Sequence, residues 1–142
     1  MKTTTNYGAG SGTGGLHNSY FGYNAGKIST GLNNTFIGSA AGQANTSGKE
    51  NAFLGRVSGL RNTTGNFNTF LGSQSGGYNT TGAHNVFLGT YSGLYNVEGI
   101  SNVFIGSNSG VGVQGISSSE NTLIGFSAGN KIEDGSYNVF IG

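Results

Sequence analysis

The sequence predicts an all-β protein, a parallel β-solenoid (β-roll) of about eight short coils of roughly 17 residues each. Three observations support this fold class. One motif, Asn-x-Phe-[Ile/Leu]-Gly, recurs along nearly the whole chain. The 142 residues include 29 glycines and no proline. Each repeat holds a single short apolar segment, and glycine-rich turns flank it on both sides.

The motif recurs at nearly constant spacing. Successive copies are 16, 17, 17, 17, 17, 19 and 17 residues apart. The glycine is followed by x-x-[Ala/Ser]-Gly, and a second turn comes later, most clearly as Asn-Thr-Thr-Gly at 62–65 and 79–82. The copies begin at Asn18, Asn34, Asn51, Asn68, Asn85, Asn102, Asn121 and Asn138.

Each repeat reads as a short strand between turns. Helices are excluded because several glycines per repeat would each cost about 1 kcal/mol relative to alanine. Propeller blades are excluded because each needs about 40 residues or more. We therefore expect residues 1–17 to be a Gly/Thr-rich segment or a partial first coil, and residues 18–142 to be tandem coils with the last one truncated.

Stacked coils explain why charge is sparse and why amides and rings recur. In such a stack each repeat position lies about 4.8 Å from its copy in the next coil, where like charges repel while amides and aromatic rings form ladders. Only 8% of the residues are charged. We expect an asparagine ladder of Asn34, Asn51, Asn68, Asn85 and Asn102, and an aromatic ladder of Phe36, Phe53, Phe70, Phe87 and Phe104.

The strands carry a second apolar row that needs a cover. Phe70 and Leu71 are both apolar, although successive strand residues point to opposite faces. An apolar stripe along a rod is too large to leave exposed. We expect another chain to cover it, most simply in a trimer around a three-fold axis. An uncapped apolar coil end also invites further stacking, so an end-to-end assembly is expected as the other form of association. The alternative is a wider monomeric coil whose interior takes both rows.

The repeats resemble the heads of trimeric autotransporter adhesins, which carry an aliphatic-Gly-x-x-[Ser/Ala] core. They resemble more closely the phage-type tail-fibre repeats that precede an intramolecular chaperone domain, with Asn68–Gly82 and Asn85–Gly99 following that order of residues. The resemblance covers Asn18 to Gly142 and implies a trimeric left-handed β-roll at a cell surface or virion, with a role in attachment. The chain differs in having Phe where those repeats usually have Ala.

Catalytic and metal-binding patterns are not evident, so we expect no enzyme, no cofactor and no metal site. His17 and His84 lie four coils apart, roughly 19 Å at the expected rise, which is too far to share a metal ion. The acidic residues are scattered over different coils. A net charge of +1 without a basic cluster argues against nucleic acid. No apolar run reaches the roughly 20 residues of a membrane span.

Aromatic residues outside the ladders are candidate surface or glycan contacts, because an apolar plate beside Asn and Thr side chains suits sugar recognition. The leading function is therefore a structural or adhesive fibre segment, extracellular or on a cell surface or virion. The alternative is a soluble β-solenoid that binds ice or a glycan, although the slot after each motif asparagine mixes Thr with Ala and Val, unlike a continuous threonine row. The candidate contacts are Tyr23, Tyr78, Tyr91, Tyr95 and Phe126.

Overall fold

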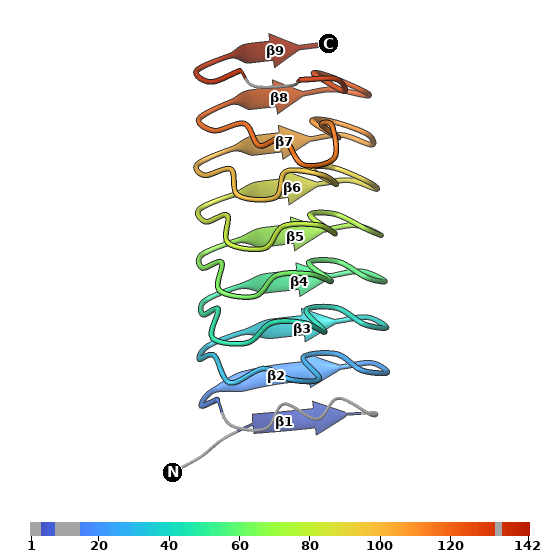
Figure 1. Cartoon of the computed structure of the whole chain (residues 1–142). Coiled ribbons are helices and arrows are strands. Elements are labelled where there is room, and N and C mark those ends of the chain that lie inside the picture. Colours follow the sequence, from blue (N-terminus) through green and yellow to red (C-terminus); the bar gives the residue numbers. More distant parts are fainter. Residues whose placement is uncertain (1–3, 8–14, 133–134) are drawn as a thin grey trace.

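The described chain forms one parallel sheet of nine strands stacked in sequence order, and it contains no helix (Figure 1). This computed structural model describes residues 4–7, 15–132 and 135–142. The β-solenoid predicted from the sequence is confirmed. The strands are β1 (Thr4–Tyr7), β2 (Asn18–Phe21), β3 (Thr35–Ile37), β4 (Ala52–Leu54), β5 (Thr69–Leu71), β6 (Val86–Leu88), β7 (Val103–Ile105), β8 (Thr122–Ile124) and β9 (Val139–Ile141).

Each coil contributes one strand, which pairs in register with the strands before and after it. Phe53 is opposite Phe70 between β4 and β5, and Phe70 is opposite Phe87 between β5 and β6. This register places every repeat position directly above its own copy. The 17-residue spacing of the sequence is therefore the length of one turn of the solenoid.

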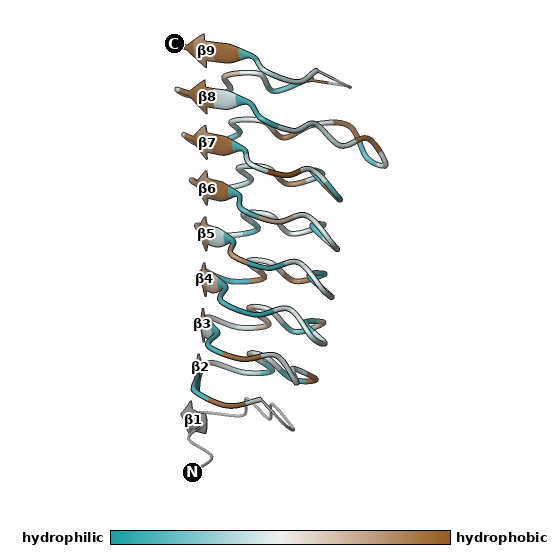
Figure 2. Ribbon diagram, turned by 90° about the vertical axis from the view of Figure 1, so that its left-hand side faces the viewer, coloured by the Kyte–Doolittle hydropathy of each residue, from teal (hydrophilic) through white to brown (hydrophobic). Residues whose placement is uncertain are grey.

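The segments that lead back from one strand to the next are also hydrogen-bonded between coils. The Gly42 N–H donates to the Ser58 carbonyl at 2.9 Å, and the Gly59 N–H donates to the Ser75 carbonyl at 3.0 Å. Figure 2 shows all strands along one side of the stack and the return segments along the other. Backbone hydrogen bonds thus join successive coils on both sides of the solenoid, not only in the sheet.

The core is a single file of side chains. In strand β5 the middle residue, Phe70, is buried, and its neighbours Thr69 and Leu71 are exposed. The same alternation recurs in the other central strands, as the two-residue period of a strand requires. Leu123 replaces the ring in β8 and is fully buried, so the file stays filled. The buried file is Tyr20, Phe36, Phe53, Phe70, Phe87, Phe104 and Leu123.

The second glycine of each repeat is required by the ring of its own coil. Gly76 has φ +56°, and a Cβ on it would lie 2.4 Å from the Phe70 ring. Small residues precede it, such as Ser75, which is fully buried. The recurring [Ala/Ser]-Gly pair is therefore the wall against which the phenyl ring packs.

The coil between β7 and β8 is longer by two residues than the 17-residue coils. Its extra length forms a loop at Gly112 and Gly115, which have φ +75° and +87°. This loop projects beyond its neighbours on the side away from the strands (Figure 2). The register of β7 and β8 is unchanged by it, with Phe104 opposite Leu123.

At the other end, β1 extends the sheet by one strand. Thr4 is opposite Asn18, and Tyr7 is opposite Phe21. Part of the segment expected at 1–17 therefore stacks as a further strand below β2. Residues 1–3 and 8–14 of that segment lie outside the described residues.

Candidate interaction surfaces

The asparagine that opens each motif is buried and bonded on three sides. The Asn51 side-chain oxygen accepts from the Asn68 N–H at 3.0 Å, and its Nδ2 donates to the Gly65 carbonyl at 2.8 Å. Its Nδ2 also lies 3.2 Å from the Asn34 Oδ1. The same pattern continues through Asn85 and Asn102. The amide thus fastens its own coil across the interior and links it to both neighbours.

A second asparagine ladder runs beside the first, and our reading of the sequence missed it. Asn62 Nδ2 donates to Asn45 Oδ1 at 2.7 Å, and Asn79 Nδ2 donates to Asn62 Oδ1 at 2.8 Å. Each of these amides also bonds the carbonyl of the glycine three residues later. The ladder ends at Asn79, whose buried Oδ1 has no hydrogen-bond partner, because Asn96 of the next coil bonds Ser118 of the long coil instead. The signal was the recurring Asn-Thr-Thr-Gly, read only as a turn.

The aromatic side chains form a column of nearly parallel rings. The Phe53–Phe70 and Phe70–Phe87 centroids are both 4.8 Å apart, with interplanar angles of 6° and 4°. Tyr20 begins the column, and its buried hydroxyl has no hydrogen-bond partner. Burial raises the pKa of the Tyr20 phenol above its ordinary value of 10.0, and the nearby Ser29 and Asn34 side chains offset this only in part.

Buried serine hydroxyls donate hydrogen bonds to backbone carbonyls inside the solenoid. The Ser75 Oγ donates to the Phe87 carbonyl at 3.0 Å, and the Ser92 Oγ donates to the Phe104 carbonyl at 3.0 Å. Both serines are fully buried. These hydroxyls are therefore structural donors that hold the wall of one coil against the strand of the next.

The second apolar row lies on the outer face of the sheet. Leu54, Leu71 and Leu88 are exposed, at 45%, 41% and 37%. The interior takes only the aromatic row, so the wider coil that would hold both rows is not the one observed. Valines at the strand starts add to this face toward one end, where Figure 2 shows β6, β7 and β9 as the most apolar strands. We call this surface the outer sheet face; its apolar row is Phe21, Ile37, Leu54, Leu71, Leu88, Ile105, Ile124 and Ile141.

The residues just before each motif asparagine form a mixed row at the edge of the sheet. His84 stacks on Phe67, with ring centroids 4.9 Å apart. Tyr137 is hydrogen-bonded to Glu120, and this contact raises the pKa of Tyr137. Across the described ranges, no three His, Cys, Asp or Glu side chains gather as a metal site would need. A membrane-spanning helix is likewise absent from the described ranges.

The five aromatic residues predicted as surface contacts fall on different parts of the coil. Tyr23 and Phe126 are strongly exposed, at 67% and 75%, just after the first glycine of their repeats. Tyr91 follows one position later and accepts a hydrogen bond from Gln74 Nε2 at 3.4 Å. Tyr78 and Tyr95 lie together on adjacent coils, with centroids 4.9 Å apart. The structure therefore groups only the last pair.

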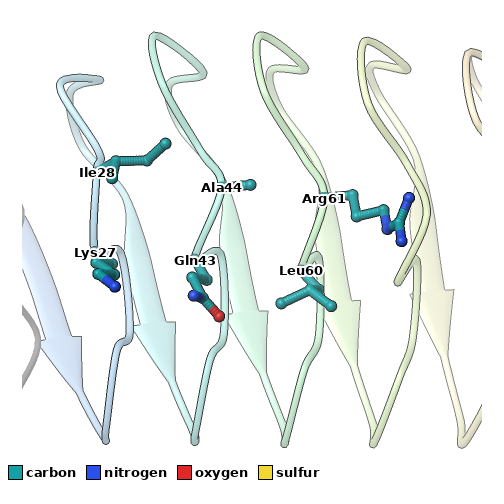
Figure 3. Close-up of a pocket in the computed structure, with 6 residues that line it drawn as sticks. All are labelled: Lys27, Ile28, Gln43, Ala44, Leu60 and Arg61. Carbon is teal, nitrogen blue, oxygen red and sulfur yellow. The ribbon is translucent and has the colours of Figure 1, made fainter.

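An open groove lies on the three coils that precede the coil of Tyr78, and Figure 3 shows the six residues that line it. Its volume is about 370 Å³. The guanidinium of Arg61, at one side of the groove, lies 4.5 Å from the centre of the Tyr78 ring. The groove crosses three successive coils, and its walls are Lys27, Ile28, Gln43, Ala44, Leu60 and Arg61.

No family model matches the chain, and comparison with curated proteins and with solved structures finds no significant match.

Proposed function

We propose that the chain is a structural and adhesive module, a rigid segment of a fibre of the tail-fibre or adhesin kind that is displayed on a virion or cell surface. The observation that carries this proposal is the uninterrupted register of the stack. Its buried asparagines and serines bond to the backbone and to one another along the axis. Polar groups placed in this way supply stiffness and length, and about eight coils would extend roughly 40 Å.

The outer sheet face supports association with further copies. Its leucines and isoleucines form one continuous row, and a stripe of that extent on a rod favours a partner surface. A three-fold axis parallel to the solenoid would bury the rows of three chains against one another. Such a trimer lets the segment continue as a fibre, because its three chains run in the same direction along the axis.

The self-association is tested by light scattering after size exclusion. We expect the whole chain to elute as a trimer and the double variant Leu71→Glu/Leu88→Glu to elute as a monomer, because each glutamate would place a charge inside the interface. The variant should keep the circular dichroism spectrum of the parent, since both positions lie on the outside of the sheet.

The matched control places the same two charges on the same two coils, away from the outer sheet face. Ser73→Glu/Thr90→Glu changes residues just after the first glycine of each repeat, and it should leave the trimer intact. A parent chain that is monomeric at about 10 µM, a concentration at which a micromolar Kd already favours assembly, would remove the assembly from this proposal.

A soluble glycan-binding role is the second candidate. The observation that favours it is the contact of Arg61, Tyr78 and Tyr95 beside an open groove. Binding by the isolated chain to a glycan array, without any self-association, would favour this candidate over the fibre.

A further inference from the structure

We infer that the groove between Lys27 and Arg61 binds a linear, carboxylate-bearing polysaccharide whose chain runs along the solenoid axis. The inference rests on the proposed attachment function and names the ligand class that the fibre would hold. Four features of the structure support it: the shape of the groove, the charges on its side of the solenoid, the stacked aromatic residues beside it, and the spacing of the coils.

The groove is apolar at its floor and polar at its ends. Ala44 is the small residue in the middle, and Ile28 and Leu60 flank it on the neighbouring coils (Figure 3). An apolar floor of this kind suits the C–H face of a sugar ring, while Gln43 offers an amide to its hydroxyl groups. Lys27 belongs to the first coil that the groove crosses and Arg61 to the third, and the Arg61 side chain extends from the groove toward the next coil (Figure 3).

The segment that carries the groove is held by backbone hydrogen bonds. The Ala44 N–H donates to the Leu60 carbonyl at 3.0 Å, and the Arg61 N–H donates to the Gly77 carbonyl at 3.1 Å. The site therefore needs little ordering when a ligand binds. None of its six residues is in a strand, so covering the outer sheet face leaves the groove open.

The charged residues at the positions that form the groove, and at the same positions in the other repeats, are all basic. The groove lies on the two residues that follow the second glycine of each repeat, which we call the return rows. Lys27, Arg61 and Lys131 all lie in the return rows, and no acidic residue does. The other three basic residues of the chain, Lys2, Lys49 and Arg56, are at other positions of the sequence. A ligand lying along these rows therefore meets cations at intervals.

Arg61 is arranged to accept a carboxylate. Its guanidinium lies over the Tyr78 ring, and Tyr95 follows at the next coil. Stacking uses the face of the guanidinium and leaves its N–H edge for a bidentate contact with a planar carboxylate. The tyrosines extend the apolar surface beyond the groove for the next sugar rings.

The coil spacing matches a repeating ligand. Successive coils are about 4.8 Å apart, close to the advance of one sugar ring along an extended polysaccharide. The backbones of Lys27 and Arg61 are two coils apart, and the Arg61 guanidinium reaches over Tyr78 of the next coil, so the two charged groups are two to three coils apart, roughly 10–15 Å at that rise. This spacing suits an acidic sugar at every second or third ring as well as at every ring. A nucleic acid fits less well, because its phosphates recur at every nucleotide and call for clustered cations.

The test measures binding of the whole chain to a purified alginate oligosaccharide by calorimetry. The comparison ligands are the same oligosaccharide with its carboxyl groups reduced, a heparin oligosaccharide, and single-stranded oligothymidylate. We expect alginate to bind, reduced alginate to bind at least about tenfold more weakly, and added salt to weaken alginate binding. Tighter binding of heparin would overturn the carboxylate assignment, and tighter binding of oligothymidylate would overturn the polysaccharide.

Variants locate the site. Arg61→Gln should lower the alginate affinity at least about tenfold, and Ala44→Trp, which fills the groove, should abolish binding. Arg56→Gln is the matched control, since it removes the same charge from an exposed residue outside the return rows, and it should bind like the parent. Equal losses in Arg56→Gln and Arg61→Gln would overturn the assignment of the groove.

The outcome for the ligand is separable from the outcome for the fibre. Absence of alginate binding in a chain that still forms trimers overturns this inference and leaves the proposed function standing. Alginate binding that is lost in Arg61→Gln, while its light scattering equals that of the parent, supports the site independently of assembly.

Discussion

At the scale of single residues, the backbone geometry of the turns is set by contact with the phenyl rings. Gly76 combines a positive φ of 56° with a position directly against the Phe70 ring. Gly115 also has a positive φ, of 87°, but a Cβ there would meet nothing within 4 Å. Substituting each glycine by alanine therefore separates two free-energy costs, that of a side chain at positive φ and that of a Cβ in contact with the phenyl ring.

Gly76→Ala is expected to lower the free energy of unfolding by about 2–5 kcal/mol, because a left-handed residue costs about 1–2 kcal/mol and overpacking the core adds about 1–3 kcal/mol. Gly115→Ala should cost only about 1–2 kcal/mol, the backbone share alone. Urea unfolding followed by circular dichroism measures both. Equal losses would mean that ring contact at Gly76 contributes nothing.

The buried amides give a second residue-level expectation. Asn68 accepts from the Asn85 N–H at 3.0 Å and donates to the Gly82 carbonyl at 2.8 Å. Asn68→Ala leaves the buried Asn85 N–H without its side-chain partner, which should lower the free energy of unfolding measured in urea by about 1–3 kcal/mol. Asn130 is exposed, and Asn130→Ala should change stability by less than about 0.5 kcal/mol. A small effect at Asn68 would show that water replaces the ladder contact.

At the scale of the coil, the periodic positions were predictable from the sequence because one repeat position meets only its own copies. Phe53, Phe70 and Phe87 recur at constant spacing, and a single rule of stacking places them all. The fold class followed from this regularity. The adjacent apolar residues Phe70 and Leu71 also predicted that Leu71 lies outside the aromatic core, because successive strand residues point to opposite faces of the sheet.

Features that depend on more than one coil position were not predictable. The ladder through Asn45, Asn62 and Asn79 requires knowing that a turn residue points inward, and the motif Asn-Thr-Thr-Gly is equally typical of an exposed turn. The groove depends on Ala44 lying between larger residues of two other coils. The ladder asparagines do recur every 17 residues, but their period does not tell whether the side chains point inward, and the residues of the groove have no common period.

Removing one whole coil should preserve the fold. Deletion of residues 68–84 removes one 17-residue repeat and joins Phe67 to Asn85, so every remaining position keeps its register. We expect a folded protein with an unchanged circular dichroism spectrum and a lower melting temperature, because one coil-to-coil contact is lost. The control deletes residues 68–75 only, which breaks the register and should unfold the stack.

At the scale of the whole molecule, stability should vary along the axis rather than from surface to core. Each coil contacts only its two neighbours in the pattern of strand pairing. The ring of Phe140, in the last strand, is 44% exposed, whereas Phe87 is fully buried between neighbours. A stack of this kind opens from its ends.

Hydrogen exchange measured by mass spectrometry should therefore show the slowest amide exchange in β4 to β7 and the fastest in the two end strands, β1 and β9. A uniform exchange rate from β1 to β9 would indicate that the stack opens all at once. The trimer should slow exchange in the strands more than in the return rows, because its interface lies on the outer sheet face.

The parallel register also determines how the molecule would respond to a pulling force. The two ends of the chain lie at opposite ends of the stack (Figure 1), so tension between them peels coils from an end one after another. Each 17-residue coil that detaches releases about 55 Å of extended chain, which far exceeds the roughly 5 Å that it occupied in the stack. Under load the solenoid would therefore dissipate work in steps of equal extension, and the number of residues in one repeat sets the size of each step.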